Sequence, residues 1–473
     1  MFEFISMKKL FLSLLLSASV LVKAQSPWDL QQCINYAIKH NLGLKQQALN
    51  NEVNKNNSNQ VRSSVLPSLN AGATHQYNFG QTIDRFTNTF ANTQVLSQNF
   101  YISSSVVLWS GLSQYNNIKA NDYSYLSGVE RLRQQENDLS LSVANAYIGI
   151  IFSEELLKIS RNQYQVTKEQ LDRTLKLVNA GALAKSVEYD IKAQLANEEL
   201  NVTTADNNYR LSMLNLQQLM NFDSVTNFSV VRPDFTLSES QLVENNVTAI
   251  YETALKNQPG VKSSEYAVMS ADKTRIASMG RYSPTLTFNA SMGTGTSGLA
   301  KKQTGEYYTV PQTLVTSMGT FTYDTQVPVL VSMPFSEQFK NNANKSIGFS
   351  LNVPLFNGLQ SNTAVKNSKI NVLNSQYSAE MTKQTLYKNI VQAITNANAA
   401  LNKYNASKLS AEAAAESFKY AQQKFDVGAI SSFDFTSAKN RLFAAESNLL
   451  QAKYDYLFKL KVLDYYQGKP LGF

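Results

Sequence analysis

The chain of 473 residues repeats itself, and this duplication constrains the fold more than any other feature of the sequence. The two halves match at two constant offsets, in sequence order. At an offset of 217 residues the identical pairs are Ala37 and Ala254, Lys39 and Lys256, Gly43 and Gly260, Lys45 and Lys262, Pro67 and Pro284, and Leu69 and Leu286. At an offset of 247 residues they are Leu108 and Leu355, Gly111 and Gly358, Lys119 and Lys366, Gly181 and Gly428, Lys192 and Lys439, Glu199 and Glu446, and Tyr209 and Tyr456. The chain is therefore expected to fold as two copies of one structural unit.

The change of offset sets the expected domain limits. It occurs once, at about residues 75–100 of the first copy, so the second copy holds about 30 extra residues. We expect these as a loop insertion near 297–343. The first repeat is expected at 25–222 and the second at 248–473. The segment 223–247 between them is expected to be a linker, because it breaks the helical periodicity.

Each copy begins with an amphipathic helix, at about 29–63 and 245–280, that ends before a proline. Pro67 and Pro284 are the expected hairpin starts, because proline stops a helix and suits the first residue of a strand. Apolar and polar residues then alternate, which is typical of strands with one apolar face. The alternating apolar residues are Leu69, Ala71 and Ala73; Phe100, Ile102, Val106 and Leu108; Leu286, Phe288, Ala290 and Met292; and Ile347, Phe349, Leu351, Val353 and Leu355.

These segments have the length, about 10 residues, that a tilted strand needs to cross a bilayer. Tyr101 and Trp109 are candidates for the membrane interface. No apolar run after the N-terminus approaches the ~18 residues of a spanning helix, so any membrane crossing is expected to use strands. Four strands cannot close a barrel, and three copies would pool twelve. The edge of a soluble β-sandwich is the alternative that the strands alone leave open.

Apolar residues at intervals of seven predict long helices that supercoil against their neighbours. They are Val143, Ile150, Leu157, Tyr164, Leu171 and Val178, then Leu195, Val202, Tyr209 and Leu216, in the first copy, and Ile390, Ala397, Tyr404, Ala411, Phe418 and Phe425, then Leu442, Leu449, Tyr456 and Leu463, in the second. No proline lies between Leu112 and Ala180, so one helix there would span about 100 Å. Gly181 and Gly428 interrupt the heptads at matching points, where we expect reversals between antiparallel helices.

The N-terminus has the pattern of a Sec signal peptide over residues 1–24. Two lysines precede an apolar run from Leu10 to Val22, and the small residue Ala24 follows. An N-terminal membrane helix is the alternative. The net charge of +8 is spread without a dense basic cluster, so nucleic-acid binding is not expected. Cys33 is the only cysteine, so burial or oligomerisation must hold an exported chain of this size.

With these features the sequence resembles the TolC family of outer-membrane efflux proteins over nearly the whole mature chain. The duplicated unit of helix, strand pair and long helix carries the resemblance, together with two local motifs. One is LFNGL at Leu355–Leu359, after the last strand. The other is KFDVGAISSFD at Lys424–Asp434, which is similar to the family's aromatic-x-x-Gly-x-x-Ser-x-x-Asp pattern.

The resemblance implies a mainly α protein with membrane β structure. The implied fold is a TolC-like trimeric barrel, four strands per protomer in a 12-stranded β-barrel, continued by a long α-helical coiled-coil periplasmic tunnel. The implied function is the exit duct of a tripartite efflux or type I secretion system in the outer membrane of a Gram-negative bacterium. The implied partners are the other copies of a homotrimer, outer-membrane lipid, a periplasmic adaptor (membrane fusion) protein and an inner-membrane pump of RND, ABC or MFS type. No cofactor is implied.

The family places acidic residues just beyond the reversal glycine, at the closed entrance of the tunnel. Asp434 follows Gly428 by six residues and matches the first such position, and Asp190 follows Gly181 by nine. In a trimer each would form a ring of three carboxylates at the pore constriction, and the Asp434 ring is a candidate for cation binding. A solvated carboxylate on a helix surface is the alternative.

The sequence departs from the family pattern at the gate. Ser437 and Val187 stand where members carry acidic residues, and Phe425 and Ile430 stand where some members carry a Tyr and an Arg. We therefore expect apolar gate packing by Phe425, Ile430 and Val187. The reversals are also the expected adaptor-docking tips, with ordinary turn composition as the alternative. The tip residues are Gly181, Ala182, Leu183, Gly428, Ala429 and Ile430.

Nothing in the sequence predicts an enzyme. The two histidines, His40 and His75, belong to different elements, and no cluster has metal-ligand spacing. The glycine-rich run Gly293–Gly298 lacks the lysine of a phosphate-binding loop, and it is expected to begin the extracellular loop. Two other functions stay open: a soluble periplasmic coiled-coil scaffold or adaptor, disfavoured by the strands, and a porin-like passive channel, disfavoured by the heptads.

Overall fold

The structure is a computed structural model that describes residues 27–84, 86–92, 94–222, 228–232 and 246–469. The expected signal peptide lies outside the described residues, and so does most of the expected linker. The chain divides into two compact units. Of the described residues, those up to 54 and those within 125–268 and 375–473 form a helical unit, and those within 55–124 and 269–374 form a sheet unit.

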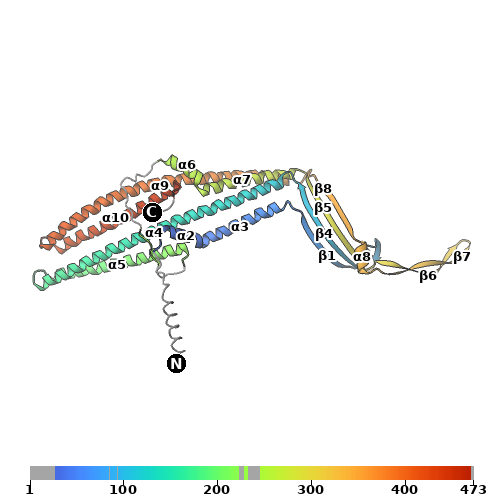
Figure 1. Ribbon diagram of the computed structural model, residues 1–473, viewed down its shortest axis with the longest axis horizontal. Helices are drawn as coiled ribbons and strands as arrows, with labels where there is room; N and C mark the ends of the chain where they lie inside the picture. Colours follow the sequence, from blue (N-terminus) through green and yellow to red (C-terminus); the bar gives the residue numbers. More distant parts are fainter. Residues whose placement is uncertain (1–26, 85, 93, 223–227, 233–245, 470–473) are drawn as a thin grey trace, which may run out of the picture. The chain divides into compact units, whose positions relative to one another are not determined.

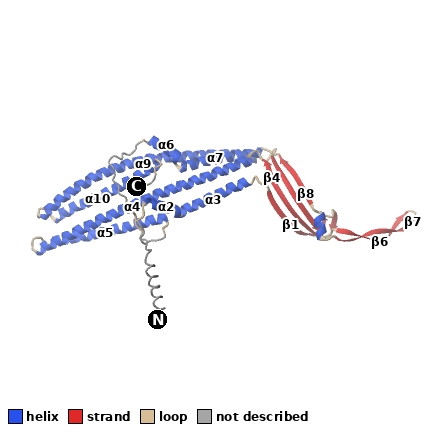
Figure 2. Ribbon diagram, viewed as in Figure 1, coloured by secondary structure: helices blue, strands red, loops and turns tan. Residues whose placement is uncertain are grey.

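Four long helices form most of the helical unit (Figures 1 and 2). They are α4 (Ser113–Asn179), α5 (Lys185–Met220), α9 (Gln360–Asp426) and α10 (Ser432–Tyr466). Both α4 and α9 contain 67 residues, which corresponds to about 100 Å of helix. The long helices and their reversals at Gly181 and Gly428 were predicted from the heptads and are confirmed.

The two amphipathic helices predicted at 29–63 and 245–280 are each broken in two. The structure has α2 (Leu30–His40) and α3 (Leu42–Ser63) in the first repeat, and α6 (Val247–Asn257) and α7 (Pro259–Met279) in the second. The breaks fall at Asn41 and Gln258, which have extended backbone and lie 217 residues apart. Pro259 disfavours helical backbone at the residue before it. In the first repeat the Asn41 side chain accepts a hydrogen bond from the backbone N–H of Leu44, at 3.2 Å, and so starts α3.

The helical unit has two apolar cores that are equivalent in the repeats. One joins α2, α4, α5 and the C-terminal part of α10, and its fully buried members include Cys33, Ala37, Val143 and Tyr147. The other joins α6, α9 and α10, around Ala254 and Ile390 and their neighbours. Burial raises the pKa of the Cys33 thiol to about 12, so this thiol is chemically inert at neutral pH.

The sheet unit is built on one antiparallel sheet of four strands in the order β1-β4-β5-β8. The strands are β1 (Ser68–Asn78), β4 (Val95–Trp109), β5 (Thr285–Ser297) and β8 (Asn344–Asn352). Strands β1 and β8 are therefore the edges, and neither pairs with a second strand on its outer side within the described residues. Val353 and Leu355, expected in the last strand, lie beyond the end of β8.

Two further hairpins lie at the end of this sheet. A short one pairs β2 (Gln81–Asp84) with β3 (Thr89–Asn92), and a long one pairs β6 (Lys301–Thr316) with β7 (Gly319–Ser332). A short helix, α8 (Phe335–Asn341), follows β7. The segment expected to be a loop insertion is thus mostly regular structure, because thirteen residue pairs join β6 to β7. The glycine-rich run before it belongs to β5 up to Ser297.

Candidate functional site: a two-faced sheet and two helix tips

One face of the four-stranded sheet is apolar across all four strands. The strand register places Ala71, Ile102 and Met292 side by side, and it does the same for Val106, Phe288 and Phe349. The apolar members of this face are Leu69, Ala71, Ala73 and Tyr77; Leu96, Phe100, Ile102, Val106 and Trp109; Leu286, Phe288, Ala290 and Met292; and Ile347, Phe349 and Leu351. Its polar members are His75, Gln98, Ser104, Thr294, Thr296 and Lys345. The β8 members are 64–76% exposed, so the chain itself does not cover them.

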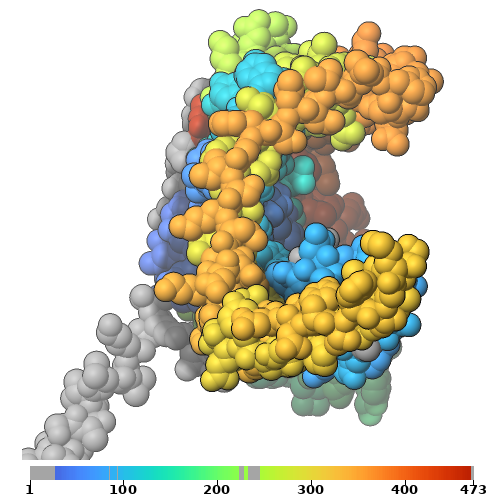
Figure 3. Space-filling view, turned by 90° about the vertical axis from the view of Figure 1, so that its right-hand side faces the viewer, coloured from blue at the N-terminus to red at the C-terminus, as the bar shows by residue number. Residues whose placement is uncertain are grey.

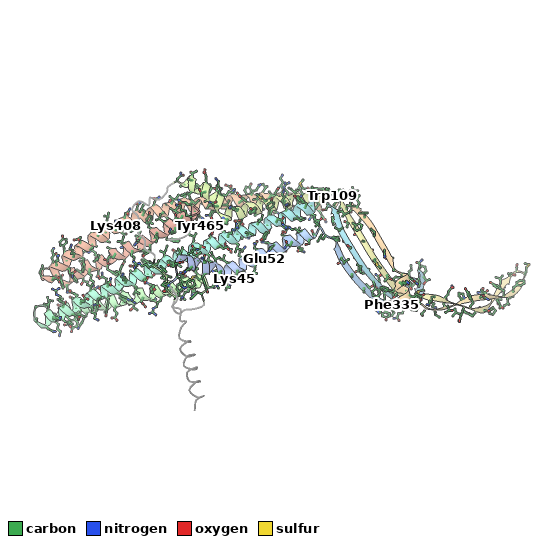
Figure 4. All side chains as sticks on the ribbon, in the orientation of Figure 1. Lys45, Glu52, Trp109, Phe335, Lys408 and Tyr465 are labelled. Carbon is green, nitrogen blue, oxygen red and sulfur yellow. The ribbon has the colours of Figure 1, made fainter. Side chains whose placement is uncertain are left out.

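The opposite face of the same sheet is polar. Its polar side chains include Asn70, Thr74 and Gln76; Ser97, Asn99, Ser103 and Ser105; Thr285, Thr287, Asn289 and Ser291; and Asn344, Ser346, Ser350 and Asn352, and Val107 is an apolar member of the same face. Tyr101 also lies on this face, with its ring over Gly72, where a Cβ atom would come within 2.7 Å of the ring. Tyr101 is therefore not part of the apolar face, whereas Trp109 ends that face at the end of β4 (Figure 4). A sheet with one apolar and one polar face suits a wall between lipid and water.

The two helix tips reverse the chain at glycines. Gly181 and Gly428 have φ values of +75° and +74°, a left-handed backbone that glycine adopts without strain. The next N–H bonds back to the last helical turn in each case, from Ala182 to the Leu177 carbonyl at 2.9 Å and from Ala429 to the Lys424 carbonyl at 2.8 Å. The tips are exposed at their glycines and alanines, and half-buried at Leu183 and Ile430.

Two exposed apolar residues of the second tip were missed by the sequence interpretation. Val427 and Phe433 flank the reversal and are each 79% exposed. The sequence contained a signal for them, because large apolar residues next to a predicted exposed turn indicate an interaction surface. They widen the exposed apolar surface at this tip beyond the predicted Ala429 and Ile430.

Both candidate pore carboxylates contact the start of α10, Asp434 from its first turn and Asp190 from the neighbouring helix α5. Ser431 caps this helix: its hydroxyl accepts a hydrogen bond from the Asp434 N–H at 3.1 Å and bonds to the Asp434 carboxylate at 2.7 Å. The Asp190 carboxylate of α5 accepts a longer hydrogen bond, 3.4 Å, from the Ser432 hydroxyl. A negative charge at a helix N-terminus is stabilised by the helix dipole. The structure thus brings Asp190 and Asp434 to one helix end, and it gives Asp434 a capping role as well.

The predicted gate residues do not form one cluster within the chain. Phe425 stacks on Phe435 of the facing helix, with ring centroids 4.7 Å apart and an angle of 24° between the planes. Phe418 packs on the same ring. Ile430 and Val187 are half-buried in their own turns. Phe435 was missed, although it lies seven residues before Leu442 and so continues the heptad series of α10.

An ion pair links the two helical hairpins close to the tips. Arg173 of α4 donates to the carboxylate of Asp426, the last residue of α9, at 2.6 Å. Both side chains are partly exposed. This contact joins the first repeat to the second just before the reversal at Gly428.

A buried polar network joins the same hairpins about two helical turns farther from the tips. The Lys439 ammonium of α10 donates to Glu198 of α5 at 3.0 Å, to the Gln163 carbonyl of α4 at 3.0 Å, and to the Thr167 hydroxyl. The Lys439 and Glu198 side chains are only 3% and 6% exposed. Three acceptors satisfy all three N–H groups of the ammonium. Burial lowers the pKa of Lys439, and the Glu198 carboxylate opposes this shift.

Two other features are absent from the part of the chain that the structure describes. The described helices contain no stretch that is long and apolar enough to cross a membrane. The described His, Cys, Asp and Glu side chains include no group of three or more that suits a metal ion.

Comparisons with known proteins agree on one family. The family described as "Outer membrane efflux protein" matches residues 33–221 and 250–468. Outer membrane protein TolC of Escherichia coli K12 is 23% identical over 462 residues, which cover 95% of this chain and 84% of TolC. The alkaline protease secretion protein AprF of Pseudomonas aeruginosa is 20% identical over 417 residues, covering 86% and 77%. One of these relatives is described as an outer membrane protein and the other as a secretion protein.

Solved structures have the same fold. The outer membrane channel CmeC of Campylobacter jejuni superposes with a TM-score of 0.74 at 16% identity, over 94% of this chain and 86% of that one. The outer membrane protein VceC of Vibrio cholerae gives 0.73 at 14% identity, over 93% and 96%. The family match covers most of this chain in both repeats. The chain therefore belongs to the outer membrane efflux protein family, the TolC family that its motifs resemble, and is an outer-membrane channel protein for efflux or secretion.

Proposed function

We propose that three copies of the chain pool their sheets into one 12-stranded barrel in the outer membrane. The two-faced sheet with two free edges carries this proposal. Strands β1 and β8 leave rows of unpaired backbone groups, which lipid does not tolerate. Pairing β1 of one copy with β8 of the next removes every edge. The apolar face then meets lipid, and the Ser, Asn and Thr side chains of the polar face line a water-filled duct.

The helical unit continues this duct through the periplasm. Its 67-residue helices have the length for such a tunnel. The polar surface of the long helices suits a permissive, wet lumen. The repeats 25–222 and 248–473 each supply one helical hairpin to the wall, and the segment 223–247 joins them.

The helix tips close the duct and dock a periplasmic adaptor. Rings of Asp434 and Asp190 form the constriction and attract cations, because like charges gathered in a narrow pore create a negative potential. The exposed Val427, Ala429 and Phe433 offer an apolar docking surface. The relatives include an alkaline protease secretion protein, so the cargo of an associated inner-membrane pump extends in principle from small molecules to proteins.

Cysteine pairs across the free edges test the assembly. Asn70→Cys in β1 is combined in one chain with Ser346→Cys, Gly348→Cys or Ser350→Cys in β8. Two strands separate these positions within a chain, about 14 Å, so an intrachain disulfide cannot form. We expect at least one pair to give covalent dimers and trimers on a non-reducing gel.

The matched control combines Asn70→Cys with Asn289→Cys on the interior strand β5. This pair should stay monomeric, because β5 already has strands on both sides. If all three β1–β8 pairs also stay monomeric in membranes, the pooled barrel is wrong.

A further inference from the structure

The β6–β7 hairpin is an exposed arm that the channel function alone does not explain. It leaves the end of β5 at Lys301 and returns at Ser332, and Figure 3 shows it in yellow beside the sheet. Most of its large apolar side chains are more than half exposed. An isolated two-stranded hairpin is marginally stable in water. The arm therefore needs a partner.

The arm has one apolar and one polar face over its paired run from Tyr308 to Val327. Residues opposite each other in the register point to the same side. The face that we call the apolar arm face contains Tyr308, Val310, Leu314, Phe321, Tyr323 and Val327, with Gln312 and Thr325 as polar members. The other face contains Thr309, Pro311, Thr313, Val315, Thr320, Thr322, Asp324 and Gln326. An uncovered apolar face of this size marks an interaction site.

The edges of the arm are poorly suited to adding a strand. Pro311 in β6 and Pro328 in β7 each lack the backbone N–H that a new strand would use. A register shift between Gln303 and Tyr307 further interrupts the β6 edge. Contact through the apolar arm face is therefore favoured over extension of the hairpin into a larger sheet.

The base of the arm is fixed to the sheet by a buried polar network. The Gln338 amide bonds to both the N–H and the carbonyl of Ser297, at 2.8 and 3.1 Å. Asp84 accepts a hydrogen bond from the Ser297 hydroxyl, and the Asn342 amide donates to the Gly295 carbonyl at 2.7 Å.

Aromatic packing and an ion pair add to this base. Phe335 of α8 (Figure 4) packs with Phe339 and with Phe100 of β4. Lys302 pairs with Glu337 at 2.5 Å. These contacts fix the base of the arm to the sheet. The direction of the arm and the orientation of its apolar face are therefore set by the fold.

We propose that the apolar arm face is an interface between copies of this chain, so that the three arms pack on one another outside the barrel. The proposal rests on the trimer proposed above. Only three residues separate β5 from β6, so assembly through β1 and β8 brings three arms to the same end of the barrel. The face carries no charged residue, so identical faces meet without repulsion. Asp324, the one charge between Tyr307 and Val327, lies on the polar face.

Neighbouring residues on opposite faces give a matched test. The full-length protein carries Leu314→Cys or Thr313→Cys, and in a second pair Phe321→Cys or Thr322→Cys. Native Cys33 is retained, because its buried thiol has a raised pKa and does not compete for maleimides. A short bismaleimide is added to outer membranes, and light scattering of each purified variant in detergent reports whether it is a trimer.

We expect covalent dimers from Leu314→Cys and Phe321→Cys and none from Thr313→Cys and Thr322→Cys. A trimer in which the Leu314 and Phe321 variants fail to cross-link overturns the arm interface and leaves the barrel intact. Equal cross-linking from both faces also overturns it. The absence of any trimer refutes the barrel, and the arm interface with it.

A membrane is the other occupant that the apolar arm face would fit. To distinguish a membrane from a second copy of the chain, a bimane label is attached to the Leu314→Cys variant in vesicles that contain brominated lipid. Bromine quenches the fluorescence only of a label in contact with lipid. Fluorescence within a few per cent of that in unbrominated vesicles is expected. Strong quenching would assign the face to the bilayer and end the proposal.

Discussion

Lys439 and Lys192 occupy equivalent positions of the two repeats, yet Lys439 is buried and Lys192 is exposed. The Lys439 side chain is 3% exposed and pairs with Glu198 of another helix, whereas Lys192 is 48% exposed and pairs with Glu188 of its own helix. The difference arises because Lys439 faces α4 and α5 of the other repeat, where Glu198 and Thr167 supply acceptors. The two repeats have thus diverged at this position, and Lys439, but not Lys192, forms a buried link between the two helical hairpins.

Removing this link is expected to destabilise the protein strongly. Lys439→Met leaves the Glu198 carboxylate buried without its cation, which costs about 3–5 kcal/mol in the free energy of unfolding. Urea unfolding followed by circular dichroism measures this change. The double variant with Glu198→Met should recover much of the loss, because no lone charge remains. Lys192→Met is the matched control, and its unfolding midpoint should stay where the wild type has it. A similar loss in both single variants would show that burial of Lys439 is not the cause.

The two lysines show which features of the fold cannot be predicted from residue spacing. Periodicity predicts elements, so the 67-residue helices and the alternating strands were found from residue spacing alone. The helix break at Gln258 depends on one local contact, between its backbone and the ring of Pro259. The burial of Lys439 depends on which helix faces it, and the repeat pattern is the same at Lys192. Side chains that meet across helices, such as Phe425 and Phe435, need the packing as well as the pattern.

The offset change predicted a loop insertion near 297–343, and no strands were predicted within it. The alternation in this segment is interrupted, since Tyr307 and Tyr308 are adjacent, Val315 follows Leu314, and Pro311 lies within β6. Proline lowers the expectation of a strand. The hydrogen-bonded ladder with β7 overrides that local preference.

Asp434 is expected to control cation block of the channel. Asp434→Asn keeps an oxygen for the Ser431 hydroxyl but removes one negative charge from each copy. We expect the affinity of a millimolar divalent blocker to fall by about tenfold, equivalent to about 1.4 kcal/mol, in single-channel recordings in a planar bilayer. Ser431→Ala distinguishes helix capping from cation binding. It should lower the free energy of unfolding by about 1 kcal/mol and leave divalent-cation block of the channel unchanged. If Asp434→Asn does not change the affinity of the blocking cation, Asp434 acts only in capping the helix.

Phe425 and Ile430 are expected to hold the resting gate closed. Phe425→Ala removes the ring that stacks on Phe435, and because the site is half-buried the cost is about 2 kcal/mol. Cells carrying Phe425→Ala or Ile430→Ala should become more sensitive to a vancomycin-sized drug, since the closed state leaks. Tyr420→Ala, at a 59% exposed site of α9 outside the tip, should not change sensitivity. Unchanged sensitivity in all three variants would exclude an apolar gate.

Glu446 is expected to make the helical unit more stable in mild acid than at neutral pH. Burial raises the pKa of this carboxyl above 4.5. Between the unfolded and folded pKa values the native state holds more protons than the unfolded state, so stability falls as pH rises through that window and stays lower above it. Glu446→Gln removes the buried charge, so its melting temperature should exceed that of the wild type at pH 7. The advantage should shrink as pH falls toward 4.5. Glu199→Gln changes the equivalent but exposed position of α5 and should show neither effect; an equal shift in both variants would trace the pH dependence to overall charge instead of burial at Glu446.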